Sequence, residues 1–331
     1  YFSIQAQRFA ADGAPLGGEF QVNSYTTGSQ GESRVVARDA GNFVVVWSSE
    51  GSAGTDPYYS IQAQRFAADG TPLGDQFQVN TYTTNHQEAP ATGMDGQGNF
   101  VVVWRSYGSH SDDDRSSIQA QRYAADGAPL GGQFQVNNLT PGAQRSPSVD
   151  VDDAGNFVIA WSTDVWSGPS YLWSIQARCY DSNGAARGDE FQVNTLTTGY
   201  QEIPAVAIGA QGRFAIAWQS DVSPGTDTDA ESIQGQLFDA DANPLGGQFQ
   251  VNSHATGSQS RPALVASAAG ELVITWSSEG SSGTDSSEES IQAQRYRANG
   301  AASGGEFQVN TYTTDTQSRP SVSLDARGNF V

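Results

Sequence analysis

The chain has 331 residues and a formal net charge of −20, from 36 acidic side chains and 16 basic ones, all of them arginine. It has no apolar run long enough to cross a membrane, no basic patch to neutralise phosphates, and a single cysteine, Cys179. These features predict no transmembrane segment, no nucleic acid partner and no disulfide framework. The abundance of Gly, Ser, Thr, Asn and aromatic residues favours strands and turns over helices.

One unit of 57 or 58 residues repeats along the whole chain. The phrase Ser-Ile-Gln has its isoleucine at 4, 61, 118, 175, 233 and 291, and the phrase Phe-Gln-Val-Asn has its phenylalanine at 20, 77, 134, 191, 249 and 307. A tryptophan recurs at 47, 104, 161, 218 and 276. Such a fixed period is the signature of a repeat architecture, with no linker and no second domain between the copies.

Each unit contains four short runs that predict strands. In chain order, residues 61–66 and 77–80 alternate between apolar and polar side chains, residues 90–92 form a short run after a polar loop, and residues 100–104 are apolar on both faces. Runs of this length with β-branched and aromatic residues, bounded by Gly, Asn and Asp, are typical of β-strands. No window has a sustained period of 3.6 residues, so no helix is predicted.

Four strands in about 57 residues predict a propeller blade, because the unit is too long for a solenoid rung and too short for a sandwich domain. A middle strand covered on both faces by neighbouring blades explains the run at 100–104. Val331 is equivalent to Val44 and Tyr1 to Tyr58. We therefore predict an all-β fold, one six-bladed β-propeller over residues 1–331 with four-stranded blades. Two strands from each terminus close its last blade. The alternative is a window from a longer tandem array, and we expect the chain to come from a longer protein.

Polar residues that recur in every unit are predicted to be structural, because a catalytic site is normally singular. Buried side-chain amides can bond backbone groups of a neighbouring blade. The alternative is a set of equivalent ligand sites. The recurring amides are Gln5, Gln62, Gln119, Gln176, Gln234 and Gln292, then Gln30, Gln87, Gln144, Gln201, Gln259 and Gln317, and then Asn23, Asn80, Asn137, Asn194, Asn252 and Asn310.

The repeat also resembles a known type. It contains Gly-Asn-Phe-Val-Val-Val-Trp-Ser-Ser at 41–49, Ser-Ile-Gln-Ala-Gln-Arg-Phe-Ala-Ala-Asp-Gly at 60–70 and Gly-Glu-Phe-Gln-Val-Asn at 18–23. These phrases resemble tandem repeats of large secreted or surface proteins of bacteria, which often carry calcium-binding RTX, VCBS or cadherin-like segments elsewhere. The resemblance covers the entire chain. It implies export to the extracellular space or cell surface, a multidomain parent and calcium, and it brings no catalytic residues.

The loops between the second and third strands of each unit vary most, and function concentrates in loops on rigid scaffolds. Several of these loops are acidic, and hard oxygen ligands at short spacing suit Ca²⁺. The alternative is a set of solvated acidic loops. The predicted metal ligands are Asp112, Asp113, Asp114, Asp227, Asp229, Asp285 and Glu288.

Aromatic residues gather in the loop at 162–174, and three tyrosines lie in neighbouring loops of the same kind. Exposed aromatic rings suit stacking on sugar rings or docking of a protein partner, and the alternative is that they cover the blade edge. The predicted ligand-binding residues are Trp166, Tyr171, Trp173, Tyr58, Tyr59 and Tyr107.

The sequence shows no Ser/His/Asp motif, P-loop or nicotinamide fingerprint, and we assign no catalytic residue and no certain cofactor. It favours a non-catalytic binding or adhesion module of a secreted or surface protein over an enzyme, with an extracellular glycan or protein as partner. Three alternatives stay open. They are a lectin-like ring that binds carbohydrate, with or without calcium, a polysaccharide hydrolase or lyase that uses a pair of the 36 acidic groups, and a self-associating surface scaffold.

Overall fold

The structure of the protein is a computed structural model. It describes residues 2–38, 41–51, 58–108, 115–139, 142–166, 171–223, 225–227, 229–280, 283–285, 288–325 and 327–331. The chain forms two compact units, Tyr1–Pro147 with Asp153–Gly155, and Ser148–Asp152 with Asn156–Val331. Apart from the short 3₁₀-helix η1 (Ala210–Gly212), the elements of the described residues are β-strands. The fold is therefore nearly all-β, as the sequence predicted.

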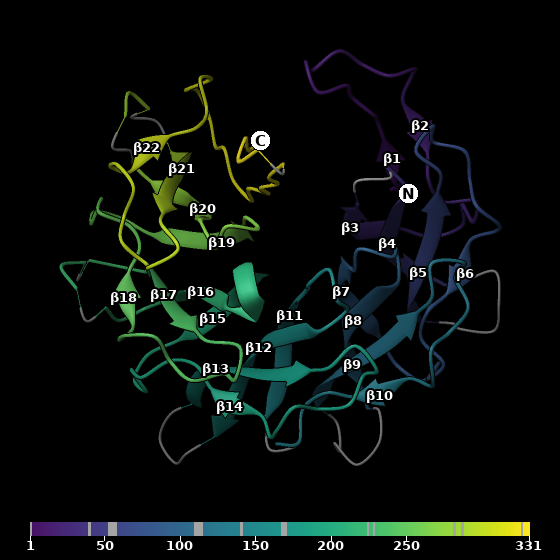
Figure 1. Cartoon of the computed structure of the whole chain (residues 1–331), viewed down its shortest axis with the longest axis horizontal. Coiled ribbons are helices and arrows are strands. Elements are labelled where there is room, and N and C mark those ends of the chain that lie inside the picture. The colour runs from purple at the N-terminus through teal and green to yellow at the C-terminus, as the bar shows by residue number, and fades with distance from the viewer. Residues whose placement is uncertain are drawn as a thin grey trace. The chain divides into compact units, whose positions relative to one another are not determined.

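The first unit contains a two-stranded sheet, β1–β2, and two four-stranded antiparallel sheets in the orders β3-β4-β5-β6 and β10-β9-β8-β7 (Figure 1). Each four-stranded sheet is a simple up-and-down meander in chain order, which is the arrangement of a propeller blade. The strands are β1 (Gln5–Ala6), β2 (Phe20–Gln21), β3 (Gln30–Ala37), β4 (Phe43–Glu50), β5 (Tyr59–Phe66), β6 (Phe77–Gln78), β7 (Gln87–Met94), β8 (Phe100–Tyr107), β9 (Ser116–Tyr123) and β10 (Phe134–Gln135).

The second unit repeats this arrangement in three further four-stranded sheets, and the boundary between the units falls within the first strand of these, β11. The strands are β11 (Ala143–Val151), β12 (Phe157–Trp166), β13 (Tyr171–Tyr180), β14 (Phe191–Gln192), β15 (Gln201–Ile208), β16 (Phe214–Ser220), β17 (Ser232–Phe238), β18 (Phe249–Gln250), β19 (Gln259–Ala266), β20 (Leu272–Glu279), β21 (Glu289–Tyr296) and β22 (Phe307–Gln308).

By repeat position, β1 and β2 correspond to the third and fourth strands of a blade, and the residues after Asn310 correspond to a first and a second strand. The described part of that last stretch includes a bridge between Leu324 and Phe330. The closure of this blade by strands from both chain ends stays a prediction.

The second strand of each four-stranded sheet lies in the core, as its apolar sequence predicted. Val46 and Val102 are fully buried, and both belong to a cluster in which Met94 and Phe100 pack against the sheet that contains Ile61. The five recurring tryptophans have no exposed surface: Trp47, Trp104, Trp161, Trp218 and Trp276. Burying a large side chain of this kind contributes about 2–3 kcal/mol, so the tryptophans are major elements of blade-to-blade stability within each unit.

The recurring asparagines bond the backbone, as predicted for structural residues, but they do so within their own repeat and not in a neighbouring blade. Asn80 accepts a hydrogen bond at Oδ1 from the backbone N–H of Ile61 at 2.8 Å and donates from Nδ2 to the carbonyl of Tyr82 at 2.8 Å. The first of these bonds recurs in all six sequence repeats, and in each of them the asparagine lies 19 residues after its isoleucine. Each asparagine thereby fixes the path of the chain as it leaves the fourth strand.

The sequence did not predict a left-handed residue that recurs at the first-strand position of every repeat, nor the β-bulge that accompanies it in four of the sheets. The residue two positions after the recurring glutamine is in the left-handed region although it is not glycine: Glu32 (φ 53°), Ala89 (51°), Ser146 (50°), Ile203 (52°), Arg261 (53°) and Arg319 (59°). In β3 and β7, as in β15 and β19, the pairing register with the next strand shifts at this point. Strained backbone of this kind re-aims the side chains around it.

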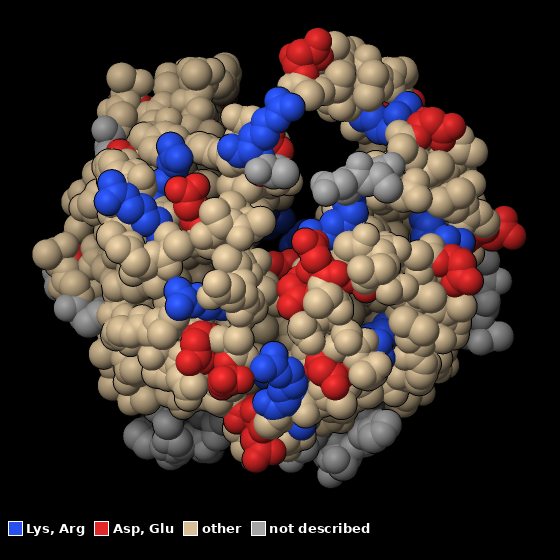
Figure 2. Space-filling model, viewed as in Figure 1, with Lys and Arg blue, Asp and Glu red and all other residues tan. Residues whose placement is uncertain are grey.

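The described residues contain no helix with the length and hydropathy that a membrane span needs. On the face shown in Figure 2, arginine and carboxylate side chains are interspersed, although the chain carries a net charge of −20. A ligand that approaches this face therefore meets both signs of charge at short range.

Candidate functional site

The blades differ most at the loop ends of their second and third strands. This place is defined by three residues: the last of the second strand, the first of the third strand, and the one before the glutamine that opens the next blade. For the sheet of β3 to β6 they are Glu50, Tyr59 and His86. The residues equivalent to Glu50 and Tyr59 are backbone partners in four blades, whereas their side chains differ. We call this repeated place the edge position.

In the first unit, three tyrosines surround His86 at the edge position. The centroid of the His86 ring lies 5.6 Å from that of Tyr58, 5.4 Å from that of Tyr59 and 6.3 Å from that of Tyr107. Tyr59 begins β5, Tyr107 ends β8, and His86 precedes β7, so three chain segments build the group. We call these four residues the Tyr–His cluster.

Carboxylates border the Tyr–His cluster. Glu88 Oε1 lies 3.9 Å from His86 Nδ1. Glu50 ends β4, and its backbone pairs directly with Tyr59. Burial raises the pKa of the Tyr59 phenol, and the negative charges of Glu50, Glu88 and Glu32 raise it further. Tyr59 therefore keeps its proton at neutral pH and can donate a hydrogen bond.

Glu32 is held in place by two hydrogen bonds. Its Oε2 accepts from the Ser48 hydroxyl at 2.8 Å and from the backbone N–H of Ala89 at 2.8 Å. Ala89 is the bulge residue of the next blade, so the left-handed backbone there aims an N–H at this carboxylate. The bulge thus fixes one of the three acidic groups beside Tyr59.

The Tyr–His cluster is accessible, and it offers both the flat faces of aromatic rings and polar groups at their edges. Tyr58 is 42% exposed, and Arg105 places its guanidinium carbon 4.3 Å from the centroid of the Tyr107 ring. Aromatic rings offer flat surfaces to the C–H faces of sugars, while carboxylates, phenols and imidazole bond hydroxyl groups or transfer protons. This set of groups can bind a sugar and perform acid–base chemistry on it.

The same position in the second unit has other side chains. Trp173 and Tyr200 take the places of Tyr59 and His86, with ring centroids 5.4 Å apart. In the next blade Ser258 donates its hydroxyl to Glu231. In the last one, Glu279, Glu288, Glu289 and Thr316 line a pocket, and Thr316 donates to Glu288. One backbone frame therefore presents aromatic groups in some blades and acidic groups in others.

The structure brings together three of the six predicted ligand-binding residues. Tyr58, Tyr59 and Tyr107 meet in the Tyr–His cluster, and Trp173 pairs instead with Tyr200 in the second unit. The side chains of Trp166 and Tyr171 lie outside the described part of the structure, although their backbones pair at the ends of β12 and β13.

The predicted metal ligands that the structure describes hold loops. Asn252 donates to Asp227 at 2.7 Å, and Asn310 donates to Asp285 at 2.8 Å in the next blade. Burial raises the pKa of Asp227, and the bond from Asn252 opposes that rise. Asp229 accepts from the backbone of Gly257 at 3.1 Å.

Asp112, Asp113 and Asp114 lie outside the described residues. Among the residues that are described, no three His, Cys, Asp or Glu side chains gather as they do around a metal ion. The calcium site stays a prediction.

Sequence reasoning did not find Glu32, Glu50, Glu88 or His86 as site residues. The signal that points to His86 is its departure from the repeat, because the equivalent residues are Ser29, Ala143, Tyr200, Ser258 and Thr316. A position that varies within a constant frame marks a place where the blades have diverged.

No model of a protein family matches the chain, and no curated protein matches it. Solved structures do. A protein of unknown function from Dyadobacter fermentans is 11% identical, with a TM-score of 0.57, over 90% of this chain and 88% of its own. The GH93 α-L-arabinofuranosidase of Fusarium graminearum, solved with arabinobiose, is 12% identical, with a TM-score of 0.57, over 90% and 85%. A PL25 ulvan lyase is 11% identical, with a TM-score of 0.51, over 87% and 71%.

These likenesses show the fold, and they confirm the predicted propeller of four-stranded blades. They also contradict our expectation of a non-catalytic binding or adhesion module, since two of the three structures are of enzymes that cleave carbohydrates. The alternative of a hydrolase or lyase agrees better with them. The uniformity of the repeats describes the blade frame and not the edge position, so it does not exclude a catalytic site.

Proposed function

We propose that this protein is a glycoside hydrolase that binds and cleaves a neutral glycan at the Tyr–His cluster. The observation that carries the proposal is the meeting of three tyrosine rings around His86 with three glutamates in electrostatic range of Tyr59. The shared fold with an arabinofuranosidase supports it.

Hydrolysis of a glycosidic bond uses a pair of carboxyl groups, one to protonate the leaving oxygen and one to act as nucleophile or to activate water. Glu50 and Glu88 are the pair that we assign. Glu32, which Ser48 and the Ala89 N–H hold in place, is a positioning residue for Tyr59. Tyr58 and Tyr107 supply the surfaces on which a sugar ring stacks.

Charge favours hydrolysis over a lyase reaction. A lyase acts next to a uronate carboxylate, whose charge must be neutralised before the neighbouring proton can leave. Three glutamates border the cluster, and the guanidinium of Arg105 lies over the Tyr107 ring. A net acidic site repels an anionic chain and accepts a neutral one.

The test is an activity screen on neutral polysaccharides, beginning with arabinan, xylan and galactan, with new reducing ends as the readout. We expect Glu88→Gln and Glu50→Gln to lower kcat by at least about 100-fold. The matched control is Glu279→Gln, which changes the residue equivalent to Glu50 in the second unit and leaves the activity unchanged.

Two results would contradict the proposal. Release of unsaturated uronate ends from an anionic polysaccharide would identify a lyase. Binding of neutral glycans to the Tyr–His cluster without new reducing ends would leave a binding site with no catalysis.

We also propose an extracellular or cell-surface location. The resemblance of the repeats to those of secreted bacterial proteins supports it, as does the extracellular occurrence of polymeric glycans.

A further inference from the structure

Arg38 departs from the repeat at a position where the side chain stabilises a turn in four other repeats and where Gly209 stands in the fifth. The equivalent residues Asp95, Asp152 and Asp325 each accept a hydrogen bond at 2.8 Å from the backbone N–H four residues later. This bond closes the turn between the first and second strands of the blade. An arginine has no acceptor, so the first unit forgoes that bond between β3 and β4. A side chain that replaces a stabilising cap in one blade points to another role.

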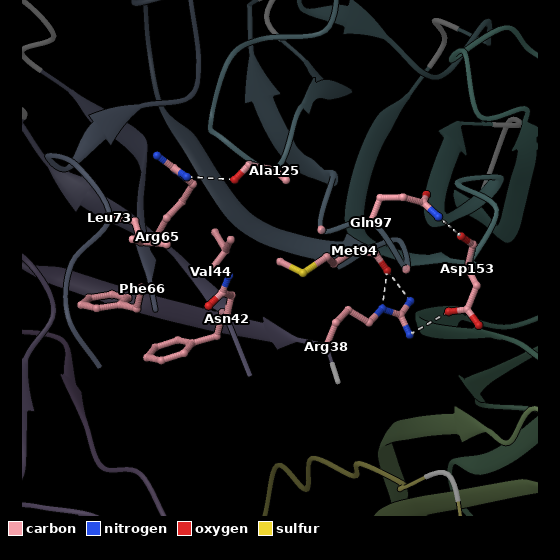
Figure 3. Close-up of a pocket in the computed structure, with 13 residues that line it drawn as sticks. Arg38, Asn42, Val44, Arg65, Phe66, Leu73, Met94, Gln97, Ala125 and Asp153 are labelled. Atoms are coloured by element: carbon pink, nitrogen blue, oxygen red, sulfur yellow. Dashed lines mark hydrogen bonds and ion pairs between the residues drawn. The ribbon is translucent and has the colours of Figure 1, made fainter. Parts of the chain in front are cut away.

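Arg38 instead joins three such turns. Its Nε donates to the carbonyl of Met94 at 2.7 Å, and its Nη1 lies 3.7 Å from Oδ1 of Asp153 (Figure 3). The carbonyl of Asp153 accepts from the side chain of Gln97 at 3.3 Å and from the N–H of Gly96 at 3.4 Å. All five residues belong to the first unit.

These turns enclose a cavity of about 380 Å³. Its polar lining includes Arg38, Gln97 and Asp153, and its apolar lining includes Met94, Val44 and Leu73 (Figure 3). The volume lies in the range of small-molecule sites, roughly 300–1,000 Å³, and such sites combine an apolar surface with a few polar groups. Arg65 also lines the cavity, but it donates to the carbonyl of Ala125 as Arg8 does to Ala68, so its role belongs to the repeat.

We propose that this cavity binds a neutral sugar unit, with one hydroxyl group between Arg38 and Asp153. At 3.7 Å the two charged groups are too far apart for a hydrogen bond. A hydroxyl that accepts from Arg38 Nη1 and donates to the Asp153 carboxylate replaces this long pair by two charge-assisted hydrogen bonds. The C–H face of the sugar packs on Phe43 and Leu73, the half-buried apolar residues of the lining.

A neutral ligand fits the pair better than an ion. Arg38 and Asp153 carry opposite charges, so an anion gains from one and is repelled by the other. Asp153 is 84% exposed, which leaves its carboxylate accessible to an incoming hydroxyl.

This site is separate from the Tyr–His cluster. Phe43 at one end of β4 lines the cavity, whereas Glu50 at the other end borders the cluster. Eight residues of extended chain span roughly 25 Å, so one sugar cannot occupy both places. The inference does not rest on the proposed hydrolase activity, because it concerns binding alone.

Met94 provides a selective reporter, because it is the only methionine of the chain and it lines the cavity. The experiment records the ¹³C-methyl signal of labelled Met94 in the full chain during titration with arabinobiose, cellobiose and galactobiose. The Glu88→Gln background prevents cleavage. We expect at least one of these neutral disaccharides to shift the signal to saturation, with a millimolar Kd.

The decisive variant is Arg38→Asp, which restores the residue found in three other blades. It should keep the melting temperature within a few degrees and weaken the disaccharide affinity at least about tenfold, as should Arg38→Gln. The control is Arg34→Gln, an exposed arginine of β3, the strand that ends one residue before Arg38. Its Nη1 bonds only the neighbouring Ser33 carbonyl among the bonds described for it. It should leave the Kd unchanged.

Three outcomes would overturn the proposal: no shift with any of the three disaccharides, an unchanged Kd in Arg38→Asp, or tighter binding of digalacturonate than of the neutral sugars. The last result would identify an anion site built on Arg38. None of these outcomes depends on whether the chain cleaves a glycan, so failure here leaves the proposed hydrolase activity to its own test.

Discussion

Trp47 donates a hydrogen bond from its indole Nε1 to Oε1 of Gln30 at 3.0 Å, and both side chains are buried. The same bond links Trp104 to Gln87, Trp218 to Gln201 and Trp276 to Gln259. Each bond ties the second strand of a blade to the start of its first strand. The recurring tryptophan and glutamine are therefore one structural device, and their repetition carries no catalytic meaning.

The first prediction tests this device. Gln87→Leu removes the acceptor of the Trp104 N–H and leaves that donor buried without a partner, which costs about 1–3 kcal/mol of unfolding free energy. Urea denaturation followed by fluorescence measures the loss. Gln5→Leu is the control, since Gln5 is exposed and bonds only Ser3 among the bonds described for it. Equal stability of the two variants would show that the buried bond contributes nothing.

The second prediction concerns alkaline stability. Burial raises the pKa of Cys179 from 9.0 to about 11. As pH rises, the unfolded chain loses this proton first, so stability that is present below pH 9 declines between pH 9 and 11. The decline from this group is on the order of 2–3 kcal/mol.

Cys179→Leu isolates that contribution, because Leu237 occupies the equivalent position in the next blade. Urea titrations of both proteins at intervals from pH 8 to 11 are the measurement. The variant should lose less stability over that interval than the parent chain. Parallel curves would refute a role for the thiol.

The third prediction concerns Tyr59. Tyr59→Phe removes a phenol that stays protonated at neutral pH, and we expect kcat on the neutral glycan to fall about tenfold, the value of one hydrogen bond to the transition state. Because burial and the nearby glutamates raise the Tyr59 pKa above 10.0, the activity profile up to pH 10 should keep the same shape in the variant. An alkaline limb that disappears with the phenol would instead show that Tyr59 ionises in the working range.

The fourth prediction separates stacking from chemistry. Tyr58→Ala removes an exposed ring from the edge of the Tyr–His cluster and should raise KM about three- to tenfold with little change in kcat. The control for a general loss of aromatic surface is Tyr312→Ala, because Tyr312 lies in the second unit and is 66% exposed. A fall in kcat at constant KM would place Tyr58 in the chemical step.

The repeat made most of the fold predictable. Continuous apolar residues at Phe100–Trp104 predicted a strand buried on both faces, and the copy number predicted the succession of four-stranded sheets. The recurring asparagines were correctly interpreted as structural. The left-handed bulge was not predicted, since residues as different as Glu32 and Ile203 occupy it and no glycine marks it.

The site was only partly predictable. Tyr58, Tyr59 and Tyr107 were singled out as aromatic residues in variable loops, but the histidine that joins them lies in another connection of the chain. Their meeting depends on the pairing of Glu50 with Tyr59, which no local pattern reveals. Asp227 shows a second limit of sequence reasoning. Its spacing resembles that of a calcium ligand, whereas its carboxylate is buried against Asn252, and burial of a single loop residue leaves no periodic trace.

The constancy of the blade frame has an engineering consequence. The Trp–Gln and Asn–Ile bonds set the backbone independently of the side chains at the edge position. Glu279 already matches Glu50, and the two strands pair alike up to this residue in both blades. Replacing Glu289 by tyrosine and Thr316 by histidine therefore transfers the side chains of Tyr59 and His86 to the second unit without inserting or deleting a residue. The chain therefore contains several copies of one backbone frame, each with a different set of side chains at the edge position.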